Sequence, residues 1–296
     1  MDDTAAFHTE LKKNDCYLGG AKVLDRVVWK KIGSDNAVVL AEDAAAYDAA
    51  LEEAAEPENG EQPAELPELD SVVFSIVAMI ATEDFWLTPC GFWKGPTAYT
   101  PAFSDLKLTC RLVAPADPVF AGDFKTVLKN IEKLMARAAT AGSTKQGIFG
   151  PKESTKASIK LRHVVFEVGA EGEDAEGYQL LDWLVRSIEV QQALQNMDAT
   201  HRVNVVPAYD VEGNLIPPAQ YVSALKGAVV RADMTLLHWH IGRDHRDSYA
   251  AEIATIRVLV PPKVAGGTSF SPSPRKRKTT VAATDSGASP GKKSRR

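Results

Sequence analysis

The stretch DLKLTCRL, residues Asp105–Leu112, alternates polar and apolar side chains without a break. Successive side chains of a β-strand point to opposite faces of the sheet, so this period of two predicts a strand with one buried face. Cys110 falls on the apolar face, and we therefore expect its thiol to pack in the core. This stretch is the clearest strand pattern in the chain, and it anchors the assignment of the fold class.

Further strands and helices are indicated on both sides of this stretch. Apolar or alternating runs bounded by turn-forming residues predict strands at Val23–Ile32, Ala37–Leu40, Ser71–Ala81, Ile159–Val165, Val203–Val206, Gly227–Ile241 and Tyr249–Val260. Apolar residues at helical spacing predict a helix over about Asp123–Ala139, with Asp123 as the N-cap. A stretch rich in Leu, Val and Ile with Trp183 predicts a second helix over about Gly177–Met197. Runs of strands with two inserted helices indicate an α+β domain with a mainly antiparallel sheet.

Charge divides the chain into segments. The formal net charge is −5, yet Glu42–Asp70 carries eleven acidic residues and no basic one, whereas residues 264–296 carry eight basic residues and one acid. We predict a polar N-terminal segment over residues 1–15, frayed or forming a short helix, and a single domain over residues 16–263. Within that domain residues 42–70 are expected to be an acidic mobile insertion whose first part, Ala44–Glu53, suits a helix; residues 264–296 are expected to be a disordered tail.

Two basic clusters in this tail resemble nuclear import signals. They are Arg275, Lys276, Arg277 and Lys278, followed by Lys292, Lys293, Arg295 and Arg296. We expect the tail to bind a nuclear import receptor and the protein to be nuclear. A sequence-independent arm for phosphates and a solubilising tail are the alternatives.

Cysteine usage and hydropathy bear on the compartment. The three cysteines are widely spaced, which fits reduced thiols in the cytosol or nucleus. The sequence offers neither a secretory leader nor an apolar run of the length that a bilayer requires, so we expect a soluble intracellular protein with no membrane partner.

Catalytic and cofactor motifs are sparse. The sequence has no phosphate-binding glycine loop ending in Lys-Ser/Thr, no Gly-x-Ser-x-Gly and no Cys-x-x-Cys, so we expect no cofactor and do not predict an enzyme. His238 and His240 are two apart on a predicted strand, and their imidazoles could bind one metal together with Asp244, Asp247 or Glu252. The alternative is that both histidines are hydrogen-bonded residues at the edge of the core.

Three places combine rings and cations in the way that single-stranded nucleic-acid binding requires. The alternation that turns His238 inward sends Arg231 and Trp239 to the opposite face of the sheet, unless a helix covers that face. Aromatic residues gather around a lysine in the loop that contains Phe92, Trp93 and Tyr99, unless this loop packs onto the core.

The third place is a lysine-rich loop that leads into a strand. Lys152 and Lys156 lie in it beside Phe149, with Lys145 before them and Lys160 and Arg162 after them. They could form an electrostatic track for phosphates, the alternative being a solvated loop. Arg243, in the turn between the last two strands, is a further predicted phosphate contact.

The final block resembles the closing strands of OB-fold single-stranded DNA-binding proteins of some phages and large viruses. The resemblance rests on YDVEGN at 209–214, GAVVRA at 227–232, YAAEI at 249–253 and the Val258-Leu259 pair, within about 50 residues. It implies a small antiparallel barrel, here elaborated with two helices, with a binding groove on a strand face. It further implies that an acidic segment such as 42–70 could compete with DNA for the groove; an inert acidic loop is the alternative.

We therefore expect non-catalytic binding of single-stranded nucleic acid in the nucleus, with DNA favoured over RNA. Bases are expected to stack on Trp239, Trp93 or Tyr99. A metal-dependent enzyme that uses His238 and His240, and a nuclear protein–protein adaptor that uses the acidic loop, are the other hypotheses. The sequence also leaves open a homo-oligomer.

Overall fold

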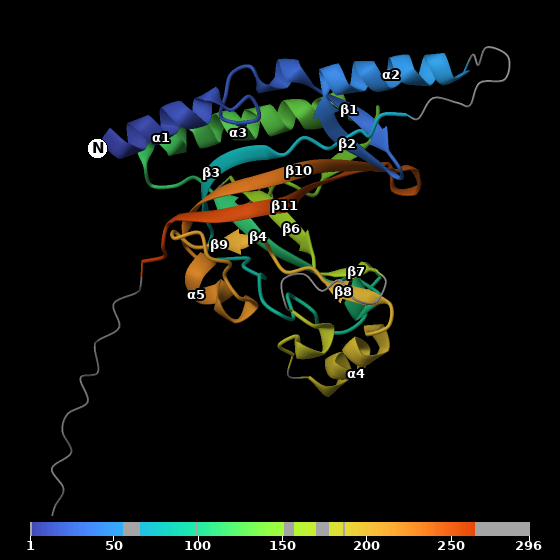
Figure 1. Cartoon of the computed structure of the whole chain (residues 1–296), viewed down its shortest axis with the longest axis vertical. Coiled ribbons are helices and arrows are strands. Elements are labelled where there is room, and N and C mark those ends of the chain that lie inside the picture. Colours follow the sequence, from blue (N-terminus) through green and yellow to red (C-terminus); the bar gives the residue numbers. More distant parts are fainter. Residues whose placement is uncertain are drawn as a thin grey trace, which may run out of the picture. The chain divides into compact units, whose positions relative to one another are not determined.

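The computed structural model describes residues 2–55, 66–98, 100–150, 157–169, 178–185 and 187–263 (Figure 1). These residues belong to one compact unit, Met1–Lys263, whereas the basic tail, Val264–Arg296, is a separate unit that lies outside the described residues. The predictions for the tail and for residues 56–65 of the acidic insertion therefore concern parts of the chain outside these ranges. Among the described residues, no helix has the length and apolar character needed to cross a membrane.

Five strands pair in a closed ring. They are β3 (Phe74–Ile80), β4 (Lys107–Val113), β6 (Ile159–Val164), β10 (Val229–Ile241) and β11 (Arg246–Val260). β3 pairs with β4, β4 with β6, β6 with β11, β11 with β10, and β10 again with β3. The β6–β11 pairing is parallel and the other four are antiparallel, so the predicted α+β fold with a mainly antiparallel sheet is confirmed.

Alternate side chains of the ring strands form the hydrophobic core. Leu106, Leu108, Cys110 and Leu112 are all fully buried, as their period of two predicts. Burial raises the pKa of the Cys110 thiol to about 12, which keeps it protonated and suits the packing role expected for it.

Helix α3 (Pro118–Arg137) begins earlier than predicted. Asp117, not Asp123, is its N-cap: the Asp117 carboxylate accepts hydrogen bonds from the backbone N–H groups of Val119 at 2.9 Å and Phe120 at 3.3 Å. The carboxylate of Asp123 is engaged over a long range, since Tyr17 Oη donates to it at 2.7 Å and His8 Nε2 lies 2.7 Å from it. A carboxylate on an apolar helical pattern was therefore misread as a cap.

Polar contacts dock α3 onto the strands and the N-terminal segment. Trp29 Nε1 donates to the backbone carbonyl of Leu134 at 2.8 Å, and Tyr249 Oη donates to that of Met135 at 2.8 Å. Together with the buried apolar face of the helix, these bonds fix α3 against the ring. In Figure 1, α1 (Asp2–Lys13), α2 (Ala41–Ala55) and α3 lie on one side of β10 and β11, and α4 (Ile188–Met197) and α5 (Tyr221–Leu225) lie on the other.

Residues 2–40 contribute a helix and a hairpin. α1 (Asp2–Lys13) is the short helix expected there, and β1 (Val27–Ile32) pairs with β2 (Asp35–Leu40) across a turn at Gly33. The predicted strand at Val23–Ile32 is too long, because Val23–Arg26 forms a 3₁₀ turn, η1, that buries Val23 and Leu24. α2 (Ala41–Ala55) extends the predicted helix at both ends.

The second predicted helix is correct only in its last part. α4 spans Ile188–Met197, whereas Leu180–Asp182 form a short 3₁₀ turn, η4. Trp183 lies between these two elements; its side chain is buried and its Nε1 donates to the carbonyl of Pro89 at 2.8 Å. The apolar residues of this stretch are divided, because Leu181, Leu184 and Ile188 are exposed.

The region from His201 to Val260 is more varied than the three strands predicted within it. It contains β8 (His201–Val203), β9 (Ala208–Tyr209), the turn η5 (Pro218–Gln220) and α5 (Tyr221–Leu225) before β10. β8 pairs with β7 (Phe166–Val168) in a sheet of its own. β9 and β5 (Thr144–Gln146) both run parallel to β11, so β11 has partners along much of its length.

The backbone at Gly147 lies very close to the backbone of β11. Its φ is +116°, and a Cβ at this position would lie 2.0 Å from the carbonyl oxygen of Tyr249. We predict that Gly147→Ala lowers the free energy of unfolding by about 3 kcal/mol or more, because backbone must move. Gly142→Ala is the matched control: Gly142 also has a positive φ but open space around it, so it should lose about 1 kcal/mol. Equal losses in urea titrations of the two variants would contradict the prediction.

Candidate nucleic-acid interface

The outer face of β4 and β6 carries four cations. Alternation turns Lys107, Thr109 and Arg111 of β4 and Lys160 and Arg162 of β6 away from the core. In the antiparallel register Thr109 lies opposite Arg162, and Arg111 lies opposite Lys160. The four positive groups are thereby gathered on two neighbouring strands.

Two adjoining hollows follow this face. The wider one has a volume of about 340 Å³ and the narrower one about 220 Å³, and both are lined by Phe92, Thr109 and Lys160. Because they share these residues, we treat them as one surface, the β4–β6 groove. Its wide end includes Lys107, Arg162 and Trp239, and its narrow end includes Asp84, Trp86 and Arg111.

Two exposed rings reach the groove from the connection between β3 and β4. The side chains of Trp86 and Phe92 are 40% and 39% exposed. Trp86 is held beside β4 because its backbone N–H donates to the carbonyl of Thr109 at 2.8 Å. Gly91, which has a φ of +50°, lies so close to Leu106 and Leu108 that a larger residue would be crowded there, and Phe92 follows it directly. The backbone that carries each ring is therefore held in place, and the ring itself is accessible.

A third ring, Trp239 of β10, is already paired with a cation. The guanidinium carbon of Arg162 lies 4.7 Å from the centre of the Trp239 ring, and Trp239 Nε1 donates to Asp35 at 2.6 Å. Arg162 Nη2 donates to Glu252 at 3.1 Å, whereas its buried Nε has no hydrogen-bond partner among the described residues. Within the described part of the chain, one donor of this arginine is therefore left without an acceptor, at a cost in free energy.

Both lysines of the groove have lowered pKa values. Burial lowers the pKa of Lys107, and the nearby Arg162 lowers it further. Burial likewise lowers the pKa of Lys160, with Arg111 as the next contributor. An anion in the groove would relieve both effects, so the electrostatics favour a ligand that carries negative charge.

The floor of the wide end is made of small residues. Gly147, Ser248, Ala250 and Ala251 line it. Short side chains on β11 leave the hollow between Trp239 and the lysines open.

The residues predicted as stacking platforms are placed differently from one another. Trp239 and Phe92 line the groove. Trp93 is partly buried and packs edge-on against Phe103, with ring centres 5.6 Å apart, and Phe149 packs against the core beside Ile159. The aromatic loop is therefore divided, with one ring facing outward and one facing the core. Tyr99 lies outside the described residues.

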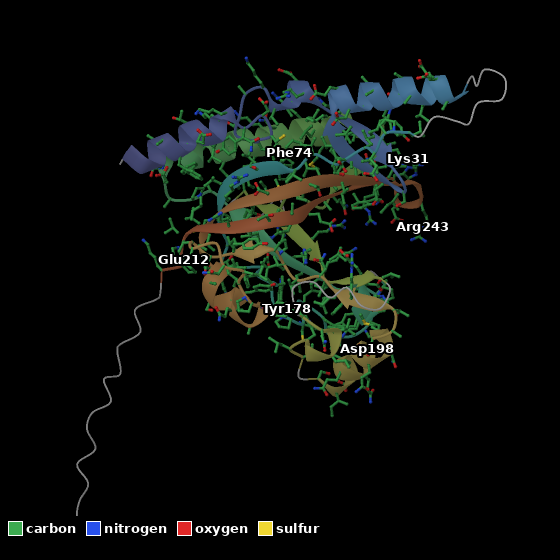
Figure 2. All side chains as sticks on the ribbon, viewed as in Figure 1. Lys31, Phe74, Tyr178, Asp198, Glu212 and Arg243 are labelled. Atoms are coloured by element: carbon green, nitrogen blue, oxygen red, sulfur yellow. The ribbon has the colours of Figure 1, made fainter. Side chains whose placement is uncertain are left out.

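The residues predicted to contact phosphates also lie in different places. Lys152 and Lys156 lie outside the described residues. Arg231 donates to Asp233 at 3.0 Å and to Ser75 at 3.2 Å, and it does not line the groove. Arg243 is 91% exposed in the turn between β10 and β11, where Figure 2 labels it. The contribution of these residues to binding stays a prediction.

Sequence reasoning missed Lys107, Arg111 and Trp86. The signal for the two cations was present in DLKLTCRL, since the alternation that places Cys110 in the core places Lys107 and Arg111 on the opposite face. Trp86 has no comparable signal in the sequence, because its position depends on the hydrogen bond to Thr109.

His238 and His240 share a buried acceptor. His238 Nε2 and His240 Nδ1 each lie 3.1 Å from Oδ1 of Asp247, whose side chain is fully buried. Thr140 adds a backbone N–H at 2.7 Å and a hydroxyl at 3.0 Å. This is the hydrogen-bonded arrangement at the core edge that the sequence allowed. Among the described residues, no group of three or more His, Cys, Asp or Glu side chains is arranged to hold a metal ion.

These hydrogen bonds determine the ionisation of Asp247. Burial by itself raises the pKa of the carboxyl, but the donors from Thr140, His238 and His240 outweigh it and lower the pKa to about 2. The carboxylate thus joins the end of β10, the start of β11 and the segment after α3 while it remains charged.

Comparisons with solved structures find phage single-stranded DNA-binding proteins, the class that the final block of the sequence resembles. The protein gp2.5 of bacteriophage T7 is 10% identical over 72% of this chain and 99% of its own, with a TM-score of 0.38. The single-stranded DNA-binding protein of bacteriophage Enc34 is 8% identical over 82% of this chain and 94% of its own, with a TM-score of 0.38. Its structure in complex with single-stranded DNA is 9% identical over 82% of this chain and 99% of its own, with a TM-score of 0.37. No family model matches the chain, and no curated protein matches it.

We predict that Asp247→Asn destabilises the protein in a pH-dependent way. Because the pKa of this carboxyl is lower in the folded than in the unfolded chain, its contribution, about 2 kcal/mol, is complete above about pH 4 and is lost as the pH falls towards 2. The difference in unfolding free energy between the parent protein and Asp247→Asn should therefore shrink by about 1 kcal/mol from pH 7 to pH 3 in urea titrations. Thr140→Val, which removes one donor, should show a smaller loss; an equal difference at both pH values would contradict the argument.

Proposed function

We propose that this protein binds single-stranded nucleic acid, DNA in preference to RNA, in the β4–β6 groove and catalyses no reaction there. The observation that carries the proposal is the groove itself, where four cations and three aromatic rings meet on the outer face of two paired strands. Cations that follow a backbone and rings that receive bases are the two elements of sequence-tolerant binding to single strands.

The order of the ring strands supports the position of the site. We propose that β3, β4, β6, β10 and β11 are the five strands of an OB-like barrel, closed by the parallel β6–β11 pairing and by β10–β11. Such barrels bind oligonucleotides on the face of their second and third strands and with the loops that follow the first and fourth. Here β4 and β6 supply the cations, the β3–β4 connection supplies Trp86 and Phe92, and the end of β10 supplies Trp239.

The two kinds of contact have separate roles. Lys107, Lys160 and Arg162 would neutralise phosphates, and the orphan Nε of Arg162 would gain an acceptor. The exposed rings of Trp86 and Phe92 would receive unpaired bases. A duplex keeps its bases stacked inside and cannot offer their faces to these rings, so the arrangement favours single strands. The resemblance of the final block favours DNA over RNA.

Salt titration separates the two roles. With a fluorescent oligonucleotide of about ten nucleotides, Lys160→Ala should weaken binding about tenfold near 0.1 M salt. It should also reduce the slope of log affinity against log salt by about 0.7, because one phosphate contact is lost. Trp86→Ala should weaken binding by a similar factor and leave the slope unchanged, since a ring releases no counterions.

Lys133→Ala provides the matched control, because Lys133 is an exposed lysine of α3 that does not line the groove. It removes the same charge and should change affinity by less than about twofold. If Lys133→Ala and Lys160→Ala weakened binding equally, net charge and not the groove would account for the affinity, and the proposal would fail.

Nuclear location is a second part of the proposal and rests on the sequence alone. The import clusters Arg275–Lys278 and Lys292–Arg296 lie outside the described residues. We propose that they address the protein to the nucleus, where single-stranded DNA would be its ligand. Imaging of the full chain beside a chain that ends at Lys263 should show nuclear accumulation of the first only; equal distributions would contradict it.

A further inference from the structure

The narrow end of the β4–β6 groove differs in charge from the wide end. At the wide end the cations are Lys107, Lys160 and Arg162, of which Arg162 is paired with Glu252 at 3.1 Å, and Asp105 is the lining carboxylate among the described residues. At the narrow end the cations are Lys160 and Arg111, and Arg111 Nε donates to Asp84 Oδ2 at 2.9 Å, so within the described ranges the lysine is the cation without a carboxylate partner there. A phosphate placed here would meet the Asp84 carboxylate, which makes the narrow end a poor site for the backbone.

The shape and lining of the narrow end suit a heterocycle. Its volume of about 220 Å³ corresponds to roughly seven water molecules, which is enough for one base. Trp86 and Phe92 both line it and offer ring surface. Thr109, Arg111 and Lys160 supply polar groups around these rings.

Asp84 is held with one carboxylate oxygen open. Its φ of +50° is a left-handed conformation that Asp and Asn adopt more readily than most residues. Arg111 occupies Oδ2, while Oδ1 accepts no hydrogen bond among the described residues, and the side chain is 60% exposed. The free Oδ1 of Asp84, an acceptor, therefore lies beside the guanidinium of Arg111, a donor, in the lining of the hollow.

We propose that the narrow end is a subsite for one unpaired base and that Asp84 makes it favour bases with an exocyclic amino group over thymine. The amino group donates to Asp84 Oδ1, a pairing known between acidic side chains and the amino group of cytosine. Arg111 or Lys160 donates to the neighbouring ring nitrogen or carbonyl. Thymine can place its single N–H on Oδ1 and one carbonyl on Arg111, but its second carbonyl then lies beside the carboxylate and is repelled by it. The inference rests on the proposed function and adds a specificity that the cations and rings alone do not give.

The test compares two short DNA strands of about ten nucleotides by fluorescence anisotropy at pH 7, with the full chain. One is all thymidine, and the other has a single central cytidine. The parent protein should bind the cytidine strand about fivefold more tightly. Asp84→Asn should bind both strands with similar affinity, because its amide can also donate to a thymine carbonyl; Asn tolerates the left-handed backbone, so the loop is retained.

Asp105→Asn is the matched control, since it removes a lining carboxylate from the wide end only. It should tighten binding of both strands and keep the fivefold ratio. A ratio near one in the parent protein, or a ratio unchanged by Asp84→Asn, would overturn the subsite while leaving the proposed function intact. If neither strand bound at all, the proposed function and the subsite would be overturned together.

Discussion

The pairing of β4 with β6 is the constraint on which both the fold and the groove depend. Its register places Leu108, Cys110 and Leu161 in the core, and the same register places Arg111 and Lys160 side by side on the outside. A slip of one residue would turn the cations inward, at a cost of several kcal/mol for each buried charge. The hydrophobic core therefore fixes the positions of the charges, although it makes no contact with a ligand.

The four cations on this face repel one another, and carboxylates offset the charge of the two arginines but not that of the two lysines. The two arginines have carboxylate partners, Asp84 for Arg111 at 2.9 Å and Glu252 for Arg162 at 3.1 Å. Within the described ranges, neither Lys107 nor Lys160 forms an ion pair, and the pKa of each is lowered by burial first and by a neighbouring guanidinium next. The arginines are thus oriented by protein groups, and the lysines keep their capacity for an external anion.

Sequence periodicity predicted which face of a strand a side chain occupies, but not which distant residues it contacts. The alternation at Asp105–Leu112 was sufficient to place Cys110 in the core, because a strand has only two faces. The predicted start of α3 is wrong although the local signal is present: Asp117 is followed by Pro118, a combination typical of a helix start. The groove was predictable only in part for a different reason, since closure of the ring brings Trp86, Arg162 and Trp239 together from three distant segments.

The stack of Arg162 on Trp239 gives the groove two unlike ends. At the wide end the guanidinium already lies over the indole ring, so a ligand meets a charged plane fixed by Glu252 and flanked by lysines. At the narrow end Trp86 and Phe92 are exposed, and the one arginine is neutralised. Under the proposed function, phosphates would be favoured at one end and bases at the other. Because a nucleic-acid strand has its backbone on one side and its bases on the opposite side, this asymmetry would restrict how the proposed ligand lies across β4 and β6.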